Sequence, residues 1–82
     1  MDILFERNDQ QLDSSIAPSI GEIVHHYQKS LLQNEESTET TVPKEDTCLI
    51  YQFTHAQYET KLRVMVTKGN RHLGNLHYSI RD

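Results

Sequence analysis

The sequence predicts an α+β domain in which one N-terminal helix packs on a three-stranded antiparallel meander, in the order α-β-β-β. Three observations support this prediction. Apolar residues follow a helical period between residues 14 and 33, they alternate with polar residues between residues 48 and 80, and two turn-like breaks divide the alternating stretch. Because the chain has 82 residues, we expect one small domain over residues 1–82.

Residues 1–13 begin with a short apolar cluster, Ile3–Phe5, and then become polar. The cluster is compatible with three structures: an edge strand added to the meander, a tether packed on the core, or a disordered start. We therefore expect a ragged N-terminus, and we leave open whether a short strand at Ile3–Phe5 joins the sheet.

Residues 14–33 carry the helical pattern, and their apolar side chains form one stripe: Ile16, Ile20, Ile23, Val24, Tyr27 and Leu31. Ser19 and Glu22 have the spacing of a capping box, in which the serine hydroxyl accepts from a free backbone amide and the glutamate reaches back. Pro18 is tolerated only near the start of a helix. These signals place the start of the helix at Ser19, or one turn earlier with Ser15 as the cap.

Residues 34–47 are polar and acidic, and Val42 is their only apolar residue. Such a segment buries too little apolar surface to become ordered, and it is longer than most connections between elements. The sequence therefore predicts a flexible acidic connector. Its acids are Glu35, Glu36, Glu39, Glu45 and Asp46.

Residues 48–82 supply the sheet, with a turn at residues 55–58 and a tight hairpin at Lys68–Asn70. One phase of the alternation is the predicted core: Leu49, Tyr51, Phe53, Leu62, Val64, Val66, Leu76, Tyr78 and Ile80. Gly74 interrupts the third run, and an isolated glycine in a strand indicates a bulge. A bulge there brings both Leu73 and Leu76 to the core face.

The other phase of the same strands is basic and partly apolar, and no second helix is predicted to cover it. Such a face is typical of a binding surface, although an antiparallel sheet also commonly exposes one face to solvent. The candidate partner-binding residues on it are Ile50, Lys61, Arg63, Met65, His77 and Arg81.

Charge is distributed unevenly along the chain. Residues 1–47 carry ten acids against three bases, whereas residues 48–82 carry two acids against five bases. An asymmetry of this kind indicates charged partners. The acidic connector is a candidate for engaging a basic surface, for example one that normally holds nucleic acid.

No motif in the sequence points to catalysis, to a metal or to a cofactor. Cys48 is the only cysteine, which excludes an internal disulfide and a cysteine-based zinc site. His25 and His26 point about 100° apart on a helix, so they do not face one ion. No apolar run has the length of a membrane span, and a lone cysteine fits a reducing compartment, so we expect a soluble cytoplasmic protein without membrane contact.

We therefore predict a small, non-enzymatic regulatory or inhibitory protein that acts by binding another protein, with a nucleic-acid-handling enzyme as one class of target. The thin core and the uncovered sheet face also favour a homodimer. Two alternatives remain: a nucleic-acid-binding regulator that uses the basic sheet face, and a small subunit of a larger assembly.

Overall fold

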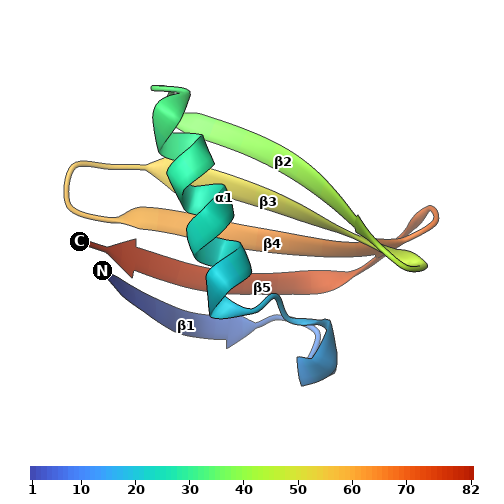
Figure 1. Ribbon diagram of the computed structural model, residues 1–82. Coiled ribbons are helices and arrows are strands. Elements are labelled where there is room, and N and C mark those ends of the chain that lie inside the picture. Colours follow the sequence, from blue (N-terminus) through green and yellow to red (C-terminus); the bar gives the residue numbers. More distant parts are fainter.

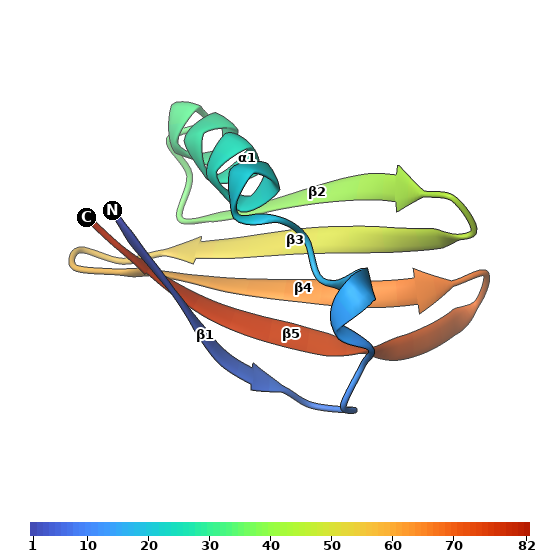
Figure 2. The same cartoon turned by 60° about the horizontal axis from the view of Figure 1, so that its bottom comes forward.

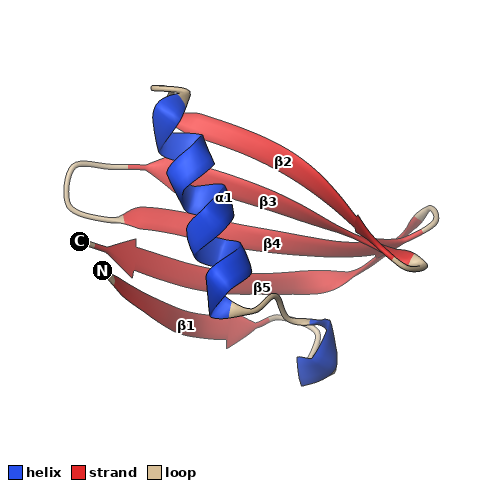
Figure 3. Ribbon diagram, in the orientation of Figure 1, coloured by secondary structure: helices blue, strands red, loops and turns tan.

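The computed structural model describes residues 1–82 as an antiparallel sheet of five strands with one α-helix on one of its faces (Figure 1, Figure 3). The strands lie side by side in the order β1-β5-β4-β3-β2, so β1 and β2 form the two edges. A single turn of 3-10 helix, η1, precedes the α-helix α1. The bounds are β1 Asp2–Asn8, η1 Ser14–Ile16, α1 Ile20–Leu32, β2 Ser37–Lys44, β3 Thr47–His55, β4 Thr60–Lys68 and β5 Arg71–Arg81.

The predicted three-stranded meander is wrong, because one further strand extends it on each side. The predicted strands correspond to β3, β4 and β5. The ragged start predicted for residues 1–13 is instead largely β1, which contains Ile3–Phe5 and pairs with β5 from Asp2 opposite Arg81 onwards. The flexible connector predicted for residues 34–47 is instead largely β2, and all eight of its residues pair with β3 without a shift in register.

β2 forms a strand despite its polarity because an edge strand with one polar face needs little apolar content. Its threonines are β-branched and fit a pleated, half-buried surface. Thr38 is buried and Val42 is half-buried on the helix side, whereas Glu39 is exposed on the other side. Two side-chain contacts fix β2 to α1. Lys44 Nζ lies 2.9 Å from Glu22 Oε2, and the hydroxyl oxygens of Ser30 and Thr38 lie 2.5 Å apart.

The predicted capping box at the start of α1 is confirmed. Ser19 Oγ accepts from the backbone N–H of Glu22 at 3.2 Å, and the Ser19 N–H donates to Glu22 Oε1 at 3.4 Å. The helix begins at Ile20 and is therefore shorter than the predicted span of residues 14–33. The predicted apolar stripe is only partly buried, because Ile23 is buried whereas Ile20 and Leu31 remain 59% and 47% exposed.

All nine residues of the predicted core phase are buried, and each is at most 6% exposed. Ile23 and Tyr27 of α1 complete the core from above the sheet. The predicted bulge is also present, since the register of β4 and β5 shifts at Leu73, which packs half-buried against the core. The structure contains no helix with the length and apolarity needed to cross a membrane.

Candidate partner-binding face

α1 lies against one face of the sheet and leaves the other uncovered, and we call the uncovered side the open face (Figure 2). The period of two along each strand determines which side chains lie there. Because Leu62, Val64 and Val66 of β4 are buried under α1, the residues between them point to the open face. The open face carries all six predicted candidates: Ile50, Lys61, Arg63, Met65, His77 and Arg81.

The strand register arranges these candidates in rows that run across the sheet. Ile50 on β3 lies opposite Met65 on β4, and both are half-buried. In the next row, Arg63 lies between Gln52 and His77. Neighbouring rows are about 7 Å apart along the strands. The open face therefore places a small apolar row directly beside a charged one.

Two of the predicted bases on the open face already have acidic partners. Lys61 Nζ lies 2.8 Å from Glu6 Oε2 and 3.4 Å from Glu59 Oε1. Arg81 Nε lies 3.1 Å from the other oxygen of Glu59, Oε2. The hydrogen bond to Glu6 raises the pKa of Lys61, while hydrogen bonds from Ser79 and Arg81 lower the pKa of Glu59. The positive charge at this end of the face is therefore largely compensated.

His77 is held by the segment that follows β1. Its Nε2 lies 2.8 Å from Asp9 Oδ2, and Arg7 Nε donates to Asp9 Oδ1 at 2.9 Å. The hydrogen bonds from His77 and then from Arg7 lower the pKa of Asp9 to about 2. One ring nitrogen of His77, Nε2, is therefore engaged in a hydrogen bond with an ionised Asp9.

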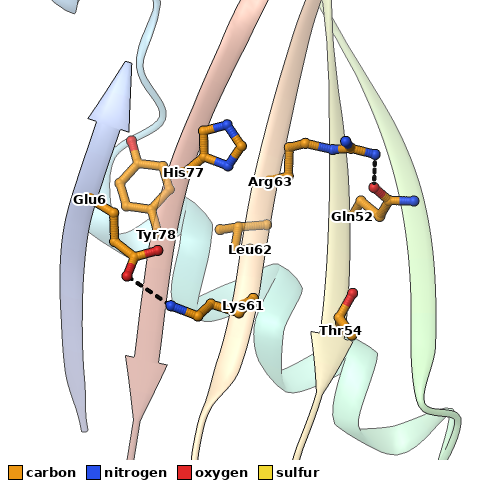
Figure 4. Close-up of a pocket in the computed structure, with 8 residues that line it drawn as sticks. All are labelled: Glu6, Gln52, Thr54, Lys61, Leu62, Arg63, His77 and Tyr78. Atoms are coloured by element: carbon orange, nitrogen blue, oxygen red, sulfur yellow. Dashed lines mark hydrogen bonds and ion pairs between the residues drawn. The ribbon is translucent and has the colours of Figure 1, made fainter. Parts of the chain in front are cut away.

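Arg63 differs from the other predicted bases, because no carboxylate lies within ion-pair distance of its guanidinium group. It donates only to the amide oxygen of Gln52 (Figure 4). A guanidinium group has five N–H donors in a planar fork that matches a carboxylate. Beside it lies a hollow of about 320 Å³, whose polar lining comes from Glu6, Gln52, Thr54, Lys61, Arg63 and His77.

The acids of the predicted connector occupy three places around β2. Glu35 and Glu36 precede the strand, Glu39 lies on its open-face side, and Glu45 and Asp46 form the turn into β3. Asp46 pairs with Lys68 at 3.2 Å between Oδ2 and Nζ. The four glutamates form no ion pair and no side-chain hydrogen bond.

Sequence reasoning missed three acids that shape this face: Glu6, Asp9 and Glu59. Glu6 and Asp9 approach the bases only because β1 pairs with β5 at the far end of the chain. The alternation of Ile3 and Phe5 with Leu4 and Glu6 is the one local signal that could have placed Glu6 on the open face. Much of the charge asymmetry between the two halves is therefore compensated within the molecule.

No group of three or more histidine, cysteine, aspartate or glutamate side chains is placed to hold a metal ion. Cys48 is half-buried and unpaired.

Comparison of the chain with protein-family models, with curated proteins and with solved structures finds no match.

Proposed function

We propose that this protein is a small, non-enzymatic regulator that binds another protein through the open face of its sheet. The observation that carries the proposal is the state of Arg63, which has a single neutral partner while Lys61, Arg81 and His77 are paired with acids. An arginine that keeps free donors beside apolar side chains has the character of an interface hot spot. The partner is expected to present a carboxylate to Arg63.

Ile50 and Met65 supply the apolar part of the same surface. Methionine adapts its shape to a partner, and the pair lies directly beside the row that contains Arg63. A partner carboxylate flanked by apolar side chains would therefore match two neighbouring rows of the sheet. Inhibition of a nucleic-acid-handling enzyme is one activity that such a surface allows, and the lone Cys48 favours action in a reducing compartment such as the cytoplasm.

The ion pairs weigh against the alternative of nucleic-acid binding. A phosphate backbone is held by several lysine and arginine side chains that release its counterions. On the open face, Lys61 and Arg81 are already compensated by Glu6 and Glu59, so phosphates would have to displace those carboxylates. A single carboxylate of a protein partner, in contrast, would need to contact only Arg63 and would not have to displace Glu6 or Glu59.

The proposal is tested by affinity capture from the native cell with quantitative mass spectrometry. Arg63→Glu reverses the charge at the proposed contact, and Arg71→Glu makes the same change at the exposed β4–β5 hairpin, away from this face. A true partner is captured by the wild type and by Arg71→Glu and is reduced at least about tenfold by Arg63→Glu. Equal capture by the two variants would rule out the open face.

Self-association belongs to the same proposal, since a second copy of the chain is also a protein partner. Light scattering at high concentration is expected to give a mass near twice 9.6 kDa, and Arg63→Glu is expected to lower it. A mass of one chain at all concentrations would exclude the homodimer, and the partner would then be a different protein.

A further inference from the structure

The two edges of the sheet differ in their readiness to accept another strand. At β1 the register shifts between Phe5 and Arg7, and the strand carries charges at Asp2, Glu6 and Arg7. Such a register shift twists an edge away and protects it from pairing. β2, in contrast, pairs with β3 continuously from Ser37 to Lys44. The β2 edge, by which we mean the outer side of Ser37–Lys44, is therefore the regular one.

The pairing of β2 with β3 determines which residues of the β2 edge have unpaired backbone N–H and C=O groups that point outward. The His55 N–H donates to the Glu36 carbonyl oxygen at 2.7 Å, which makes Glu36 and His55 a hydrogen-bonded pair. Such pairs alternate with non-bonded pairs along an antiparallel ladder. Ser37, Glu39 and Thr41 therefore direct their backbone N–H and C=O groups away from β3. Pro43, which has no N–H, ends this row of donors.

Unpaired acids surround the β2 edge. Glu35, Glu36, Glu39 and Glu45 are exposed and form no ion pair, and the only base of the strand, Lys44, is held by Glu22 at 2.9 Å. A second copy paired edge to edge would bring these glutamates close to their own counterparts, which is unfavourable. A basic segment is complementary to them.

The helix side of the same edge carries Thr38, Thr40 and the apolar Val42, and it lies beside the last turn of α1. The contact of Ser30 with Thr38 places the last turn of α1 over β2, as Figure 1 also shows. That turn leaves Leu31 and Leu32 exposed by 47% and 86%. Because side chains of an added strand alternate between the two faces, one set would lie beside Glu39 and the other near the end of α1.

We propose that the β2 edge is a strand-addition site for an extended segment of a partner protein in which basic and apolar residues alternate. The segment adds antiparallel to β2 as a sixth strand. Its basic residues lie on the open-face side next to Glu39, and its apolar residues lie on the helix side, beside Val42 and the last turn of α1. Main-chain hydrogen bonds to Ser37, Glu39 and Thr41 hold it. This site is separate from Arg63 and does not depend on the function proposed above.

The test uses the full chain and a fluorescent peptide of about ten residues in which lysine and valine alternate, which is long enough to span the strand. Thr41→Pro removes an outward N–H without removing a bond to β3, and Thr41→Ala is the matched control that keeps this N–H. Measured by fluorescence anisotropy, Thr41→Pro is expected to weaken binding at least about tenfold and Thr41→Ala by less than about twofold. Equal affinities for the two variants would overturn the proposal.

A second comparison changes only the peptide, so it holds even where Thr41→Pro fails to fold. In an antiparallel pair, the residues that exchange hydrogen bonds have side chains on the same face. N-methylation of the lysine amides is therefore expected to abolish binding to the wild type, whereas N-methylation of the valine amides is tolerated. Equal binding of the two methylated peptides would exclude strand addition in this orientation.

The charge component has its own controls. Glu39→Gln is expected to weaken the binding of the lysine–valine peptide. A peptide in which glutamate and valine alternate is expected not to bind. Arg71→Glu, at the β4–β5 hairpin, is the charge control and leaves the affinity unchanged. Because Thr41 lies on β2 and Arg63 lies on β4, a failure at the β2 edge is distinguishable from a failure at the open face. Binding of the glutamate–valine peptide with equal affinity would contradict the inferred partner chemistry.

Discussion

Ser30 Oγ on α1 lies 2.6 Å from Nε2 of His55 at the end of β3. The contact belongs to a chain of hydrogen bonds, because Ser30 Oγ also lies 2.5 Å from Thr38 Oγ1 and His55 Nδ1 lies 3.0 Å from Thr60 Oγ1. The four residues come from α1, β2, β3 and β4. A buried polar chain of this kind fixes where the helix ends relative to β2, the strand that forms the proposed docking edge.

Loss of the Ser30 hydroxyl is expected to destabilise the protein. Ser30 and Thr38 are 3% and 6% exposed, so Ser30→Ala leaves buried hydrogen-bonding groups without a partner. We expect the free energy of unfolding to fall by about 1–3 kcal/mol in urea denaturation. Ser37→Ala, at an exposed serine without a side-chain hydrogen bond, is the control and should change it by less than about 0.5 kcal/mol. Equal effects would show that the hydrogen-bond chain adds nothing to stability.

Removal of the Tyr51 hydroxyl is expected to stabilise the protein. Tyr51 is fully buried, and its hydroxyl oxygen has no hydrogen-bond partner. Burial raises the pKa of Tyr51 far above its ordinary value, so the group is a neutral phenol. Tyr51→Phe should raise the free energy of unfolding by about 1 kcal/mol. Tyr58→Phe, at a tyrosine that is 84% exposed, should leave it unchanged. A less stable Tyr51→Phe protein would show that the hydroxyl makes a favourable contact.

Stability is expected to decrease in mild acid because of His26. Its ring packs on Tyr51 at a centroid distance of 4.6 Å, and burial lowers its pKa from 6.5. Below pH 6.5 the unfolded chain takes up a proton at this histidine that the folded protein resists, so the free energy of unfolding falls with pH. His26→Phe should flatten the profile between about pH 7.5 and pH 5.5, and His72→Phe, at an exposed histidine of β5, should not. If the free energy of unfolding of His26→Phe depends on pH as steeply as that of the wild type, another group causes the loss of stability in mild acid.

Asp9 extends the acid dependence to lower pH with the same sign. Its pKa is lowered from 3.8 to about 2, chiefly by the hydrogen bond from His77. Its stabilising effect is therefore complete above pH 3.8 and is lost as the pH falls towards 2. Asp9→Asn should remove this part of the profile, and an identical acid limb in wild type and variant would contradict the pairing with His77.

The ion pairs of the open face predict weak affinity for nucleic acid. The wild type should not retard DNA or RNA at low ionic strength, because Glu6 and Glu59 compensate Lys61 and Arg81. The double variant Glu6→Gln with Glu59→Gln frees both bases and should create a salt-dependent affinity. Strong retardation by the wild type would instead favour a nucleic-acid-binding protein.

The parts of the fold that depend on local signals were predictable. Ser19 and Glu22 mark the helix start within four residues of sequence, and Leu62, Val64 and Val66 show the buried phase of a strand directly. β2 was not predictable in this way, because Thr38 and Thr40 replace the apolar side chains that a central strand would carry. At an edge, one buried threonine, Thr38, and one half-buried threonine, Thr40, are enough.

The composition of the open face was predictable, but its net charge was not. The period of two places Ile50, Arg63 and Met65 on one side whatever the neighbouring strands are. The compensation of Lys61 by Glu6 depends on β1 lying beside β5, which joins residues 55 positions apart in the chain. Only the spatial arrangement therefore distinguishes Arg63 from the other bases.

Photo-cross-linking in the native cell tests the open face most directly. A photoreactive amino acid at Thr54, which is exposed and lines the hollow beside Arg63, should form an adduct with a defined partner. The same residue at Gln28, which is exposed on α1, is the positional control. We expect the adduct to disappear in Arg63→Glu and to persist in Arg71→Glu. An adduct that persists in Arg63→Glu, or forms equally from Gln28, would contradict binding through the open face.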